Sequence, residues 1–186
     1  MKMKKIYTLT LAALLASAPT AVCNAAEDHT ALPYNGAEGA NVSEGYDNLF
    51  DCDITTKWCV TDFYQTETFV EWTQPSEGMN LSGLLLATAN DNSLHEGRNP
   101  SKWQLSGKMK SSDEWEILAE STDTFSMEDV DYQVYKISFP QTIQPYNYYR
   151  FDILETTGAN TLQISELHLC FEGKEDINLT APIKEE

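Results

Sequence analysis

Apolar residues in this 186-residue chain occur in short runs that alternate with turn-forming residues. Such runs are typical of β-strands, and they lie at 58–60, 68–72, 81–88, 103–105, 115–118, 132–139, 148–154 and 162–169. Clusters rich in Ser, Gly, Asp and Asn separate nearly every pair of runs, and no long amphipathic helical pattern occurs. The pattern predicts an all-β fold, an antiparallel β-sandwich or jelly roll.

Two of these runs carry more detail. In 148–154 the odd-numbered positions 149, 151 and 153 are apolar, whereas the even-numbered positions include Arg150 and Asp152, so the faces of that strand are assigned. In 162–169 the alternation breaks between Ile164 and Leu167. We expect a β-bulge there that changes the orientation of Ser165 and Glu166.

The N-terminus has the pattern of a secretory signal peptide. Lysines at positions 2, 4 and 5 precede an apolar run that ends in small residues, which predicts a leader over residues 1–25 and a secreted, periplasmic or extracellular protein of bacterial style. Polar residues interrupt the run, and no later segment is apolar enough for a transmembrane span. A lipid anchor at Cys23 is the alternative, although the bulky Val22 before it fits that signal poorly.

The mature chain is strongly acidic. Removal of the leader leaves 9 basic residues against 29 acidic ones, a net charge near -20, and Arg98 and Arg150 are the two arginines of the sequence. This balance argues against nucleic acid and anionic membranes as partners. About 160 residues suit one domain. We expect a linker at 26–40, the sandwich at 41–172 and a polar tail at 173–186.

An acidic turn precedes the first expected strand. In NLFDCDITTKW, residues 48–58, Asp51, Asp53 and Thr56 offer closely spaced oxygen donors of the kind that bind a hard cation such as calcium. Acidic turns are also commonly just solvated, and the loop by itself lacks a second contributor from elsewhere in the chain.

Together with other motifs, this turn resembles the discoidin or coagulation factor V/VIII C-type domain, which is a galactose-binding-like jelly roll. The motifs are NLFDCDITTKW (48–58), ATANDN (87–92), GRNPSKWQLSGK (97–108), YNYYRFDIL (146–154) and LQISELHL (162–169). The resemblance covers most of the mature chain. It implies a sandwich that binds a structural calcium ion at the base of one set of loops, and carbohydrate ligands in many members.

The resemblance also implies which residues hold the ion. Asp51 and Thr56 would supply side-chain oxygens, and Glu166 would complete the site from the last strand. Backbone carbonyls would come from Asn48, Asp53 and Ser165. Cys52 departs from the pattern, because it stands where the family commonly has glycine and where the backbone can require a conformation costly for other residues.

The cysteines add little certainty. Cys52, Cys59 and Cys170 remain after the leader, so one disulfide and one free thiol could form among them, and the sequence does not choose the pair. Cys59 could equally be a buried free thiol. The three histidines are too scattered to suggest a zinc site.

Catalytic signatures are missing from the sequence. It contains no recognisable nucleophile with its base and no glycine-rich phosphate loop. A glycoside-processing enzyme remains a lesser alternative, because its two carboxylates need be close only in space. The resemblance implies a non-catalytic binding module for a glycan or polysaccharide. A module for adhesion to a protein partner is the second alternative, and it would show a broad exposed apolar patch.

The loop at 90–99 holds the densest polar cluster between two expected strands, with Asn92, His95, Glu96 and Arg98. Polar side chains beside an aromatic platform suit sugar hydroxyls, so these four residues are the predicted ligand site. The alternative is that GRNP simply forms the turn before Trp103. We expect the four tryptophans, Tyr148 and Phe151 in the core. Tyr46, Phe63, Tyr64 and Phe125 lie in expected loops and are the candidates for a stacking ring.

Overall fold

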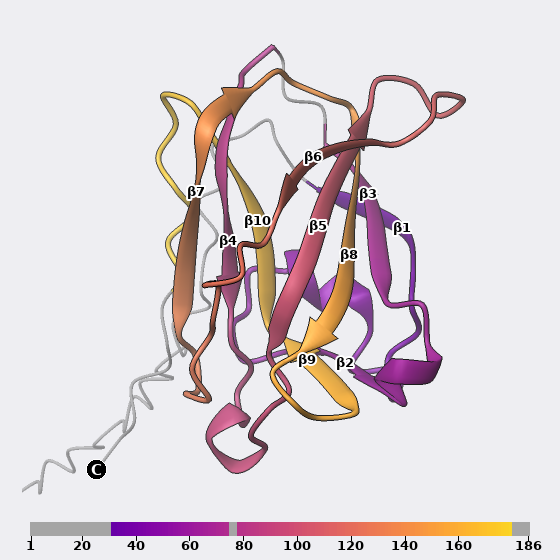
Figure 1. The fold of residues 1–186 in the computed structure, drawn as a ribbon, viewed down its shortest axis with the longest axis vertical. Helices are drawn as coiled ribbons and strands as arrows, with labels where there is room; N and C mark the ends of the chain where they lie inside the picture. Colours follow the sequence, from indigo (N-terminus) through magenta and orange to yellow (C-terminus); the bar gives the residue numbers. More distant parts are fainter. Residues whose placement is uncertain (1–30, 75–77, 180–186) are drawn as a thin grey trace, which may run out of the picture.

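The computed structural model describes residues 31–74 and 78–179 (Figure 1). The expected leader at 1–25, the alternative anchor residue Cys23 and the last seven residues of the expected tail lie outside this part of the chain. Secretion and lipidation therefore stay predictions. No helix within the described ranges is long and apolar enough to cross a bilayer.

The described residues form strands and three short 3-10 helices. The helices are η1 (Tyr46–Phe50), η2 (Phe63–Gln65) and η3 (Asn92–Leu94). The strands are β1 (Leu32–Gly36), β2 (Trp58–Thr61), β3 (Phe69–Thr73), β4 (Leu81–Ala87), β5 (Pro100–Lys108), β6 (Glu116–Glu120), β7 (Val134–Ile143), β8 (Tyr148–Thr156), β9 (Thr161–Ile164) and β10 (Glu166–Phe171).

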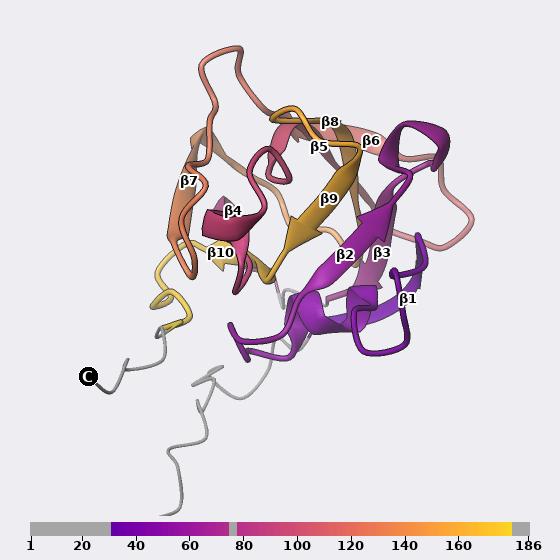
Figure 2. The same cartoon turned by 90° about the horizontal axis from the view of Figure 1, so that it is seen from below.

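The strands build two packed antiparallel sheets and a ribbon. One sheet has the order β1-β3-β8-β5-β6 and the other has the order β10-β4-β7. The ribbon of β2 and β9 crosses one end of the sandwich (Figure 2). This is the all-β, galactose-binding-like sandwich that the sequence predicted, because turns every few residues let neighbouring runs pair antiparallel.

The core lies between the sheets and is rich in stacked aromatic rings. Trp72 stacks on Tyr149 at 5.6 Å between ring centroids, and Trp103 stacks on Phe151 at 5.4 Å. Each buried ring contributes about 1.5–3 kcal/mol through the surface it removes from water. The predicted faces of the strand at 148–154 are confirmed, because Tyr149, Phe151 and Ile153 are buried, whereas Arg150 and Asp152 are not.

Two expected core aromatics lie at the surface boundary instead. Trp115 precedes β6 and is half-buried, with the Lys108 ammonium 4.2 Å from its ring centroid. Tyr148 is also half-buried, and the same ammonium lies 6.0 Å from its ring. A cation over an aromatic face is favourable where the ring is partly exposed, so these two rings cover the Lys108 side chain and do not fill the core.

The expected linker is wrong for its described part. Residues 32–36 form β1, which pairs with β3 through Leu32 opposite Thr73 and Gly36 opposite Val70. Ala37 follows in the core and donates its amide to the Phe69 carbonyl at 2.9 Å. β1 is an edge strand, where Pro and Gly are tolerated, so its composition resembles that of a linker. The sandwich therefore begins ahead of the expected boundary at residue 41.

The expected bulge near Ser165 is a change of sheet. β9 pairs with β2, with Ile164 opposite Trp58, whereas β10 pairs with β4, with Glu166 opposite Ala87. Ser165 lies between the strands. The break in apolar alternation was a true signal, but its cause is that the chain leaves the ribbon and enters the three-stranded sheet. Ser165 and Glu166 therefore face the acidic turn from the junction of two layers.

Candidate functional site

The β2–β9 ribbon lies across one end of the sandwich (Figure 2). Side chains alternate across a strand, and Trp58, Val60, Leu162 and Ile164 all contribute to the core. The alternate pair, Cys59 opposite Gln163, therefore lies on the outer side of the ribbon. Three loops surround that face: the loop after β4, the loop before β7 and the turn between β8 and β9.

Asn92 holds the loop after β4 in place from inside. Its side chain is completely buried. Its Oδ1 accepts the Ala89 amide at 2.7 Å and the Gln163 Nε2 at 3.0 Å, and its Nδ2 donates to the Asn99 Oδ1 at 2.7 Å. Of the four predicted ligand residues, Asn92 is thus the one whose polar groups are used within the protein. It positions the loop, and its contacts leave it no accessible group for a ligand.

A second amide extends this network to the loop before β7. Asn99 is also fully buried, and its Nδ2 donates to the Glu128 carbonyl at 3.0 Å and to Asp129 Oδ1 at 3.1 Å. The amide of Gly97 donates to both carboxylate oxygens of Asp129 at 3.1 Å, from a left-handed backbone with φ of 82°. Buried hydrogen bonds of this kind fix one loop conformation.

Arg98 lies between Gly97 and Asn99 of this hydrogen-bonded loop, and most of its guanidinium N–H groups are without a partner in the described part of the chain. Its backbone carbonyl accepts the Gln163 amide at 2.9 Å, and its Nη1 donates to the Gln163 Oε1 at 3.3 Å. Within the described residues the Arg98 guanidinium makes this one hydrogen bond, and the side chain is half-buried. A guanidinium has five N–H donors, so Arg98 can still bind hydroxyl oxygens. The GRNP segment also leads into β5, which begins at Pro100, while the ligand role of Arg98 stays a prediction.

His95 and Glu96, the other two predicted ligand residues, are exposed. His95 Nε2 lies 3.7 Å from the Asp91 Oδ2. Asp91 is held by Lys57, whose Nζ lies 2.7 Å from each of its carboxylate oxygens. His95 therefore stands beside an ion pair at the rim, whereas Glu96 has no recorded side-chain contact within the described ranges. The structure brings His95 and Arg98 to one surface.

Tyr64 is the exposed ring among the four aromatic candidates. Phe63 is buried, Phe125 packs against Trp103 with ring centroids 5.9 Å apart, and Tyr46 is half-buried. In contrast, 59% of Tyr64 is exposed. Its backbone amide donates to the Asn160 Oδ1 at 2.9 Å, which fixes the ring beside the β8–β9 turn.

A short chain of contacts links Tyr64 to the Arg98 loop. The Tyr64 hydroxyl lies 3.4 Å from the Thr156 hydroxyl, which donates to the Ala159 carbonyl at 2.6 Å. The Ala159 amide in turn donates to the Gly97 carbonyl at 2.9 Å, next to Arg98. An exposed ring and a guanidinium with spare donors therefore share one end of the sandwich, which is the combination that sugar binding needs.

The expected metal residues meet where the acidic turn approaches the start of β10. Asp51 Oδ1 accepts the Asp53 amide at 2.8 Å, and Asp51 Oδ2 accepts the Thr56 hydroxyl at 2.9 Å. The same hydroxyl lies 3.0 Å from the Asp53 carbonyl. Cys52 has φ of 61°, the left-handed conformation that the sequence suggested for this position. The turn thus gathers a carboxylate, a hydroxyl and a carbonyl on one side.

Two further expected ligands contact the turn differently. The Ser165 hydroxyl donates to the Ile54 carbonyl at 2.7 Å and to the Thr56 carbonyl at 2.9 Å. The Asn48 Nδ2 donates to the Ser43 and Lys57 carbonyls at 2.8 and 2.7 Å. Both side chains therefore stabilise the loop, and the backbone carbonyls of Asn48 and Ser165 are the groups left for the predicted role.

Glu166 faces Asp51 from the fully buried start of β10. Burial, and next the negative charge of Asp51, raise the pKa of Glu166 to about 9. One oxygen lies 2.7 Å from His168 Nε2, and burial lowers the pKa of that imidazole to about 4. The carboxyl also faces the Asp51 side chain and the Cys52 backbone, and its other oxygen, Oε1, is buried without a hydrogen bond of good geometry among the described residues. A hard cation between Glu166 and Asp51 would give Oε1 a partner and would offset the repulsion between the two carboxylates.

The donor chemistry fits calcium better than a softer metal. It consists of two carboxylates, one hydroxyl and backbone carbonyls, which are all oxygen donors. No group of three or more His, Cys, Asp or Glu side chains that could hold a metal ion occurs within the described ranges.

The cysteines do not pair as the sequence allowed. Cys59 and Cys170 are both buried free thiols. Cys52 is disulfide-bonded, with neither of those two as its partner. Cys59 lies on the outer side of the ribbon beneath the surrounding loops, where burial, and next the negative charge of Glu44, raise the pKa of its thiol. It therefore behaves as a small apolar side chain of the frame.

The sequence did not single out Gln163, which joins Asn92 and Arg98. Its outward place opposite Cys59 followed from strand alternation, but the loop that covers it did not. Asn99 and Asp129 were missed for the same reason, since loops have no periodicity from which an inward direction could be inferred.

Comparison with known proteins establishes the fold. No family model and no curated protein sequence matches the chain. Among solved structures, the chain is similar to a two-module structure of family 32 carbohydrate-binding domains from Clostridium perfringens ZmpB in complex with GalNAc. The TM-score is 0.61 at 16% identity, over 81% of this chain and 37% of that one. The chain thus spans little more than a third of that two-module protein.

Two single-domain structures match nearly end to end. The family 32 module of C. perfringens NanJ in complex with galactose gives a TM-score of 0.51 at 14% identity, over 77% of this chain and 93% of that one. An F5/8 type C domain from Bacteroides fragilis gives 0.59 at 14% identity, over 77% and 97%. The resemblance to discoidin domains that the sequence motifs suggested is confirmed in the fold.

Proposed function

We propose that this chain is a secreted, non-catalytic module that binds glycans at the end closed by β2 and β9. The observation that carries the proposal is the exposed Tyr64 ring, which hydrogen bonds through Thr156 and Ala159 connect to the loop that holds the Arg98 guanidinium. A flat ring can cover the apolar face of a sugar, and Arg98 and His95 can bind its hydroxyls. The galactose and GalNAc complexes of structures with this fold support galactose-type sugars as the first ligands to test.

The first experiment is a glycan array with the mature protein, followed by calorimetry with galactose and GalNAc. We expect Tyr64→Ala and the double variant His95→Ala/Arg98→Ala each to weaken sugar binding by tenfold or more, which corresponds to about 1.4 kcal/mol. Tyr34→Ala is the matched control, because Tyr34 is 47% exposed on the edge strand β1.

Each outcome of these measurements has a clear meaning. Unchanged sugar affinity in both site variants would reject this surface. A blank array with a folded protein would reject glycan binding and favour adhesion to a protein partner.

We further propose a structural calcium ion between the acidic turn and β10. Asp51 and Glu166 would bind it through carboxylates and Thr56 through its hydroxyl, with carbonyls from Asn48, Asp53 and Ser165. The support is the buried, unpaired Glu166 Oε1 opposite Asp51. Calcium would supply the positive charge that keeps both carboxylates ionised and would tie β10 to the turn.

Thermal unfolding in calcium and in chelator tests the ion separately from sugar binding. Calcium at 100 times its dissociation constant would add about 2.7 kcal/mol of stability. For a domain of this size that corresponds to a rise in Tm of roughly 5–10 °C. An unchanged Tm would reject the calcium site and leave the glycan proposal standing.

A further inference from the structure

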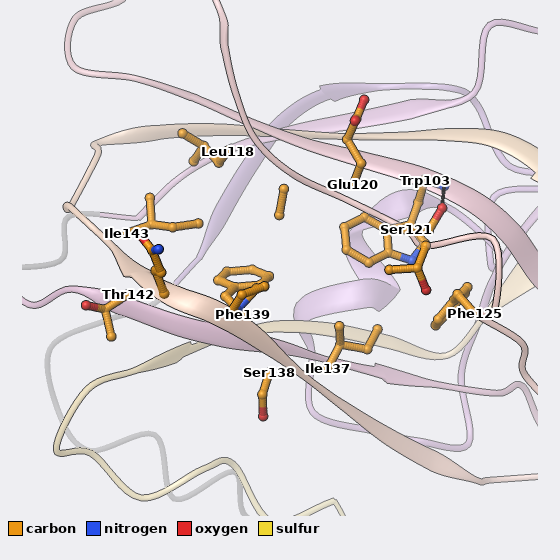
Figure 3. A pocket seen from close by; sticks show the side chains of 14 residues that line it. Trp103, Leu118, Glu120, Ser121, Phe125, Ile137, Ser138, Phe139, Thr142 and Ile143 are labelled. Atoms are coloured by element: carbon orange, nitrogen blue, oxygen red, sulfur yellow. Dashed lines mark hydrogen bonds between the residues drawn. The ribbon is translucent and has the colours of Figure 1, made fainter.

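A groove opens on the side of the sandwich (Figure 3), and no residue of β2 or β9 lines it. It lies between β6, the edge of the five-stranded sheet, and β7, the edge of the three-stranded sheet. Its volume is about 690 Å³, which is within the range of sites for small molecules. Its walls come from β5, β6, β7 and the segment after β6, and none of the residues assigned to the glycan or calcium proposals lines it.

Partly buried apolar residues at the edge of the core gather in this groove. Eleven half-buried apolar residues pack against the core, and six of them line this groove: Leu118, Ala119, Phe125, Ile137, Phe139 and Ile143. Figure 3 shows Ile137 and Phe139 reaching in from β7, while Phe125 lies on the side of Trp103. Apolar surface gathered in a concave site gains free energy when a ligand removes it from water.

One wall of the groove holds an unused hydrogen-bond donor. Trp103 lines the groove and is almost completely buried, and its Nε1 has no hydrogen-bond partner within the described ranges. The adjacent Ser121 hydroxyl accepts the backbone amide of Trp103 at 3.1 Å and makes no hydrogen bond with this nitrogen. A buried donor without a partner is costly, so an acceptor that reached this nitrogen would be favoured. The nitrogen is covered, so the side chains after β6 must shift to admit the acceptor.

The lining also restricts the charge of a ligand. Glu120 is the one ionisable residue among the lining residues, and its carboxylate accepts the Gln104 Nε2 at 2.7 Å. Without a cationic side chain, the groove has nothing to pair with a carboxylate or a phosphate. Fatty acids and phosphorylated compounds are therefore disfavoured against uncharged molecules.

The edge strands disfavour an added peptide strand. β7 carries Lys136 and Pro140, and β6 begins and ends with Glu116 and Glu120. Charged residues and proline on an edge oppose pairing with another strand. A compact ligand that rests on the side chains avoids this obstacle.

We propose that the groove between β6 and β7 binds a small, uncharged, mainly apolar molecule with one oxygen acceptor, such as an aromatic ketone, and that the indole N–H of Trp103 donates to that oxygen. This site is independent of the glycan site, since the two share no residue.

The test uses prodan, an uncharged aromatic ketone whose fluorescence shifts to the blue in an apolar site. We expect saturable blue-shifted fluorescence with the wild-type protein. Ala119→Trp, which fills the groove, should weaken binding at least tenfold. Ile117→Trp is the matched control, because Ile117 lies on the same strand, is 57% exposed and does not line the groove.

A matched pair of competitors tests the donor. We expect 2-acetylnaphthalene to displace prodan about tenfold more effectively than 2-ethylnaphthalene, which lacks the acceptor. In Trp103→Phe, which keeps an aromatic ring and removes the N–H, the two competitors should become equivalent. Circular dichroism and Tm would confirm that each variant is folded, and glycan binding should be unchanged in Ala119→Trp.

Several results would overturn the proposal. They are the absence of saturable binding, equal binding in Ala119→Trp and wild type, or no preference for the ketone. Dimerisation of the wild type that Ala119→Trp abolishes, without prodan binding, would show that a second copy of the chain covers the groove. None of these results bears on the glycan proposal, which rests on other residues.

Discussion

The end closed by β2 and β9 and the groove between β6 and β7 are the two proposed binding surfaces, and their side chains differ in kind. At the ribbon, Asn92 and Asn99 are fully buried and hydrogen-bonded to their neighbours. At the groove, apolar side chains are half-buried, and the Trp103 donor has no partner within the described ranges.

This difference teaches how each region should respond to change. A buried polar network is directional, so the loss of one member leaves several partners unsatisfied. An apolar wall is not directional, and similar side chains can replace one another at small cost. We therefore expect the ribbon end to be sensitive to single substitutions and selective for ligand geometry. The groove should tolerate substitution and select by shape and charge.

The largest expected effect is at Asn92. Asn92→Ala removes the acceptor of two N–H groups and the donor to Asn99, so it should lower the free energy of unfolding by roughly 2–4 kcal/mol. Urea unfolding measures the loss. Leu94→Ala is the control in the same short helix, and because Leu94 is 79% exposed its change should be below about 0.5 kcal/mol. Equal effects would show that the network is not what holds this end.

The next effect distinguishes charge from structure at the proposed calcium site. Glu166→Gln keeps a hydrogen-bonding side chain beside His168 but removes a calcium ligand. The variant should lose the calcium-dependent gain of about 2.7 kcal/mol. In chelator it should be as stable as the wild type or more so, because the wild-type carboxyl must take up a proton to be buried beside Asp51, whereas the neutral amide of Gln needs none. A full calcium response in Glu166→Gln would contradict the proposed ligand set.

A pH series in chelator examines the same carboxyl. Burial and Asp51 raise the pKa of Glu166 from 4.5 to about 9 in the folded protein. The folded state then holds a proton that the unfolded state has released, so stability is greatest below pH 4.5 and falls as the pH rises toward 9. Between pH 7 and 8.5 the loss should be about 1–2 kcal/mol in urea unfolding.

Titration of His168 changes stability with pH in the opposite direction. Its pKa is lowered from 6.5 to about 4 in the folded protein, so the folded state loses stability as the pH falls. That slope lies mainly below pH 7, outside the window of this measurement. Glu166→Gln should give a flatter profile above pH 7, and an equally steep fall in that variant would assign the effect to another group.

The smallest expected effect comes from the same substitution, Ile→Val, made once in the wall of the groove and once in the core. Ile137→Val in the half-buried wall of the groove should cost about 0.5 kcal/mol or less, whereas Ile164→Val in the completely buried face of β9 should cost about 1 kcal/mol. Thermal unfolding of both variants provides the ratio. Equal losses would mean that the groove wall is packed as tightly as the core.

The sequence predicted the sandwich well because the eight apolar runs alternate or lie between turn residues. It missed β1, since Leu32 and Tyr34 are exposed on an edge strand and leave no apolar face to detect. It joined β9 and β10 into one run, because a change of sheet and a bulge disturb alternation in the same way. Long-range pairing of strands was not available from local pattern.

The candidate site was predicted only as a neighbourhood. The loop at 90–99 was correctly found as a polar cluster, but loop composition does not say that Asn92 turns inward while His95 and Arg98 stay accessible. The meeting of Asp51 and Glu166, 115 positions apart in the chain, followed from resemblance to a family and not from spacing. Tyr64 became distinct from three other aromatic candidates only through its exposure.

The passage of the chain from β9 to β10 has a mechanical consequence. Two residues separate Gln163 from Glu166. Gln163 makes hydrogen bonds with Asn92 and Arg98, and Glu166 faces Asp51. Ser165, between them, donates to the carbonyls of Ile54 and Thr56. This four-residue stretch connects the frame of the proposed glycan surface to the proposed calcium site. A disturbance at either end is transmitted along covalent bonds, so ion occupancy would set the stiffness of the surface that receives the glycan.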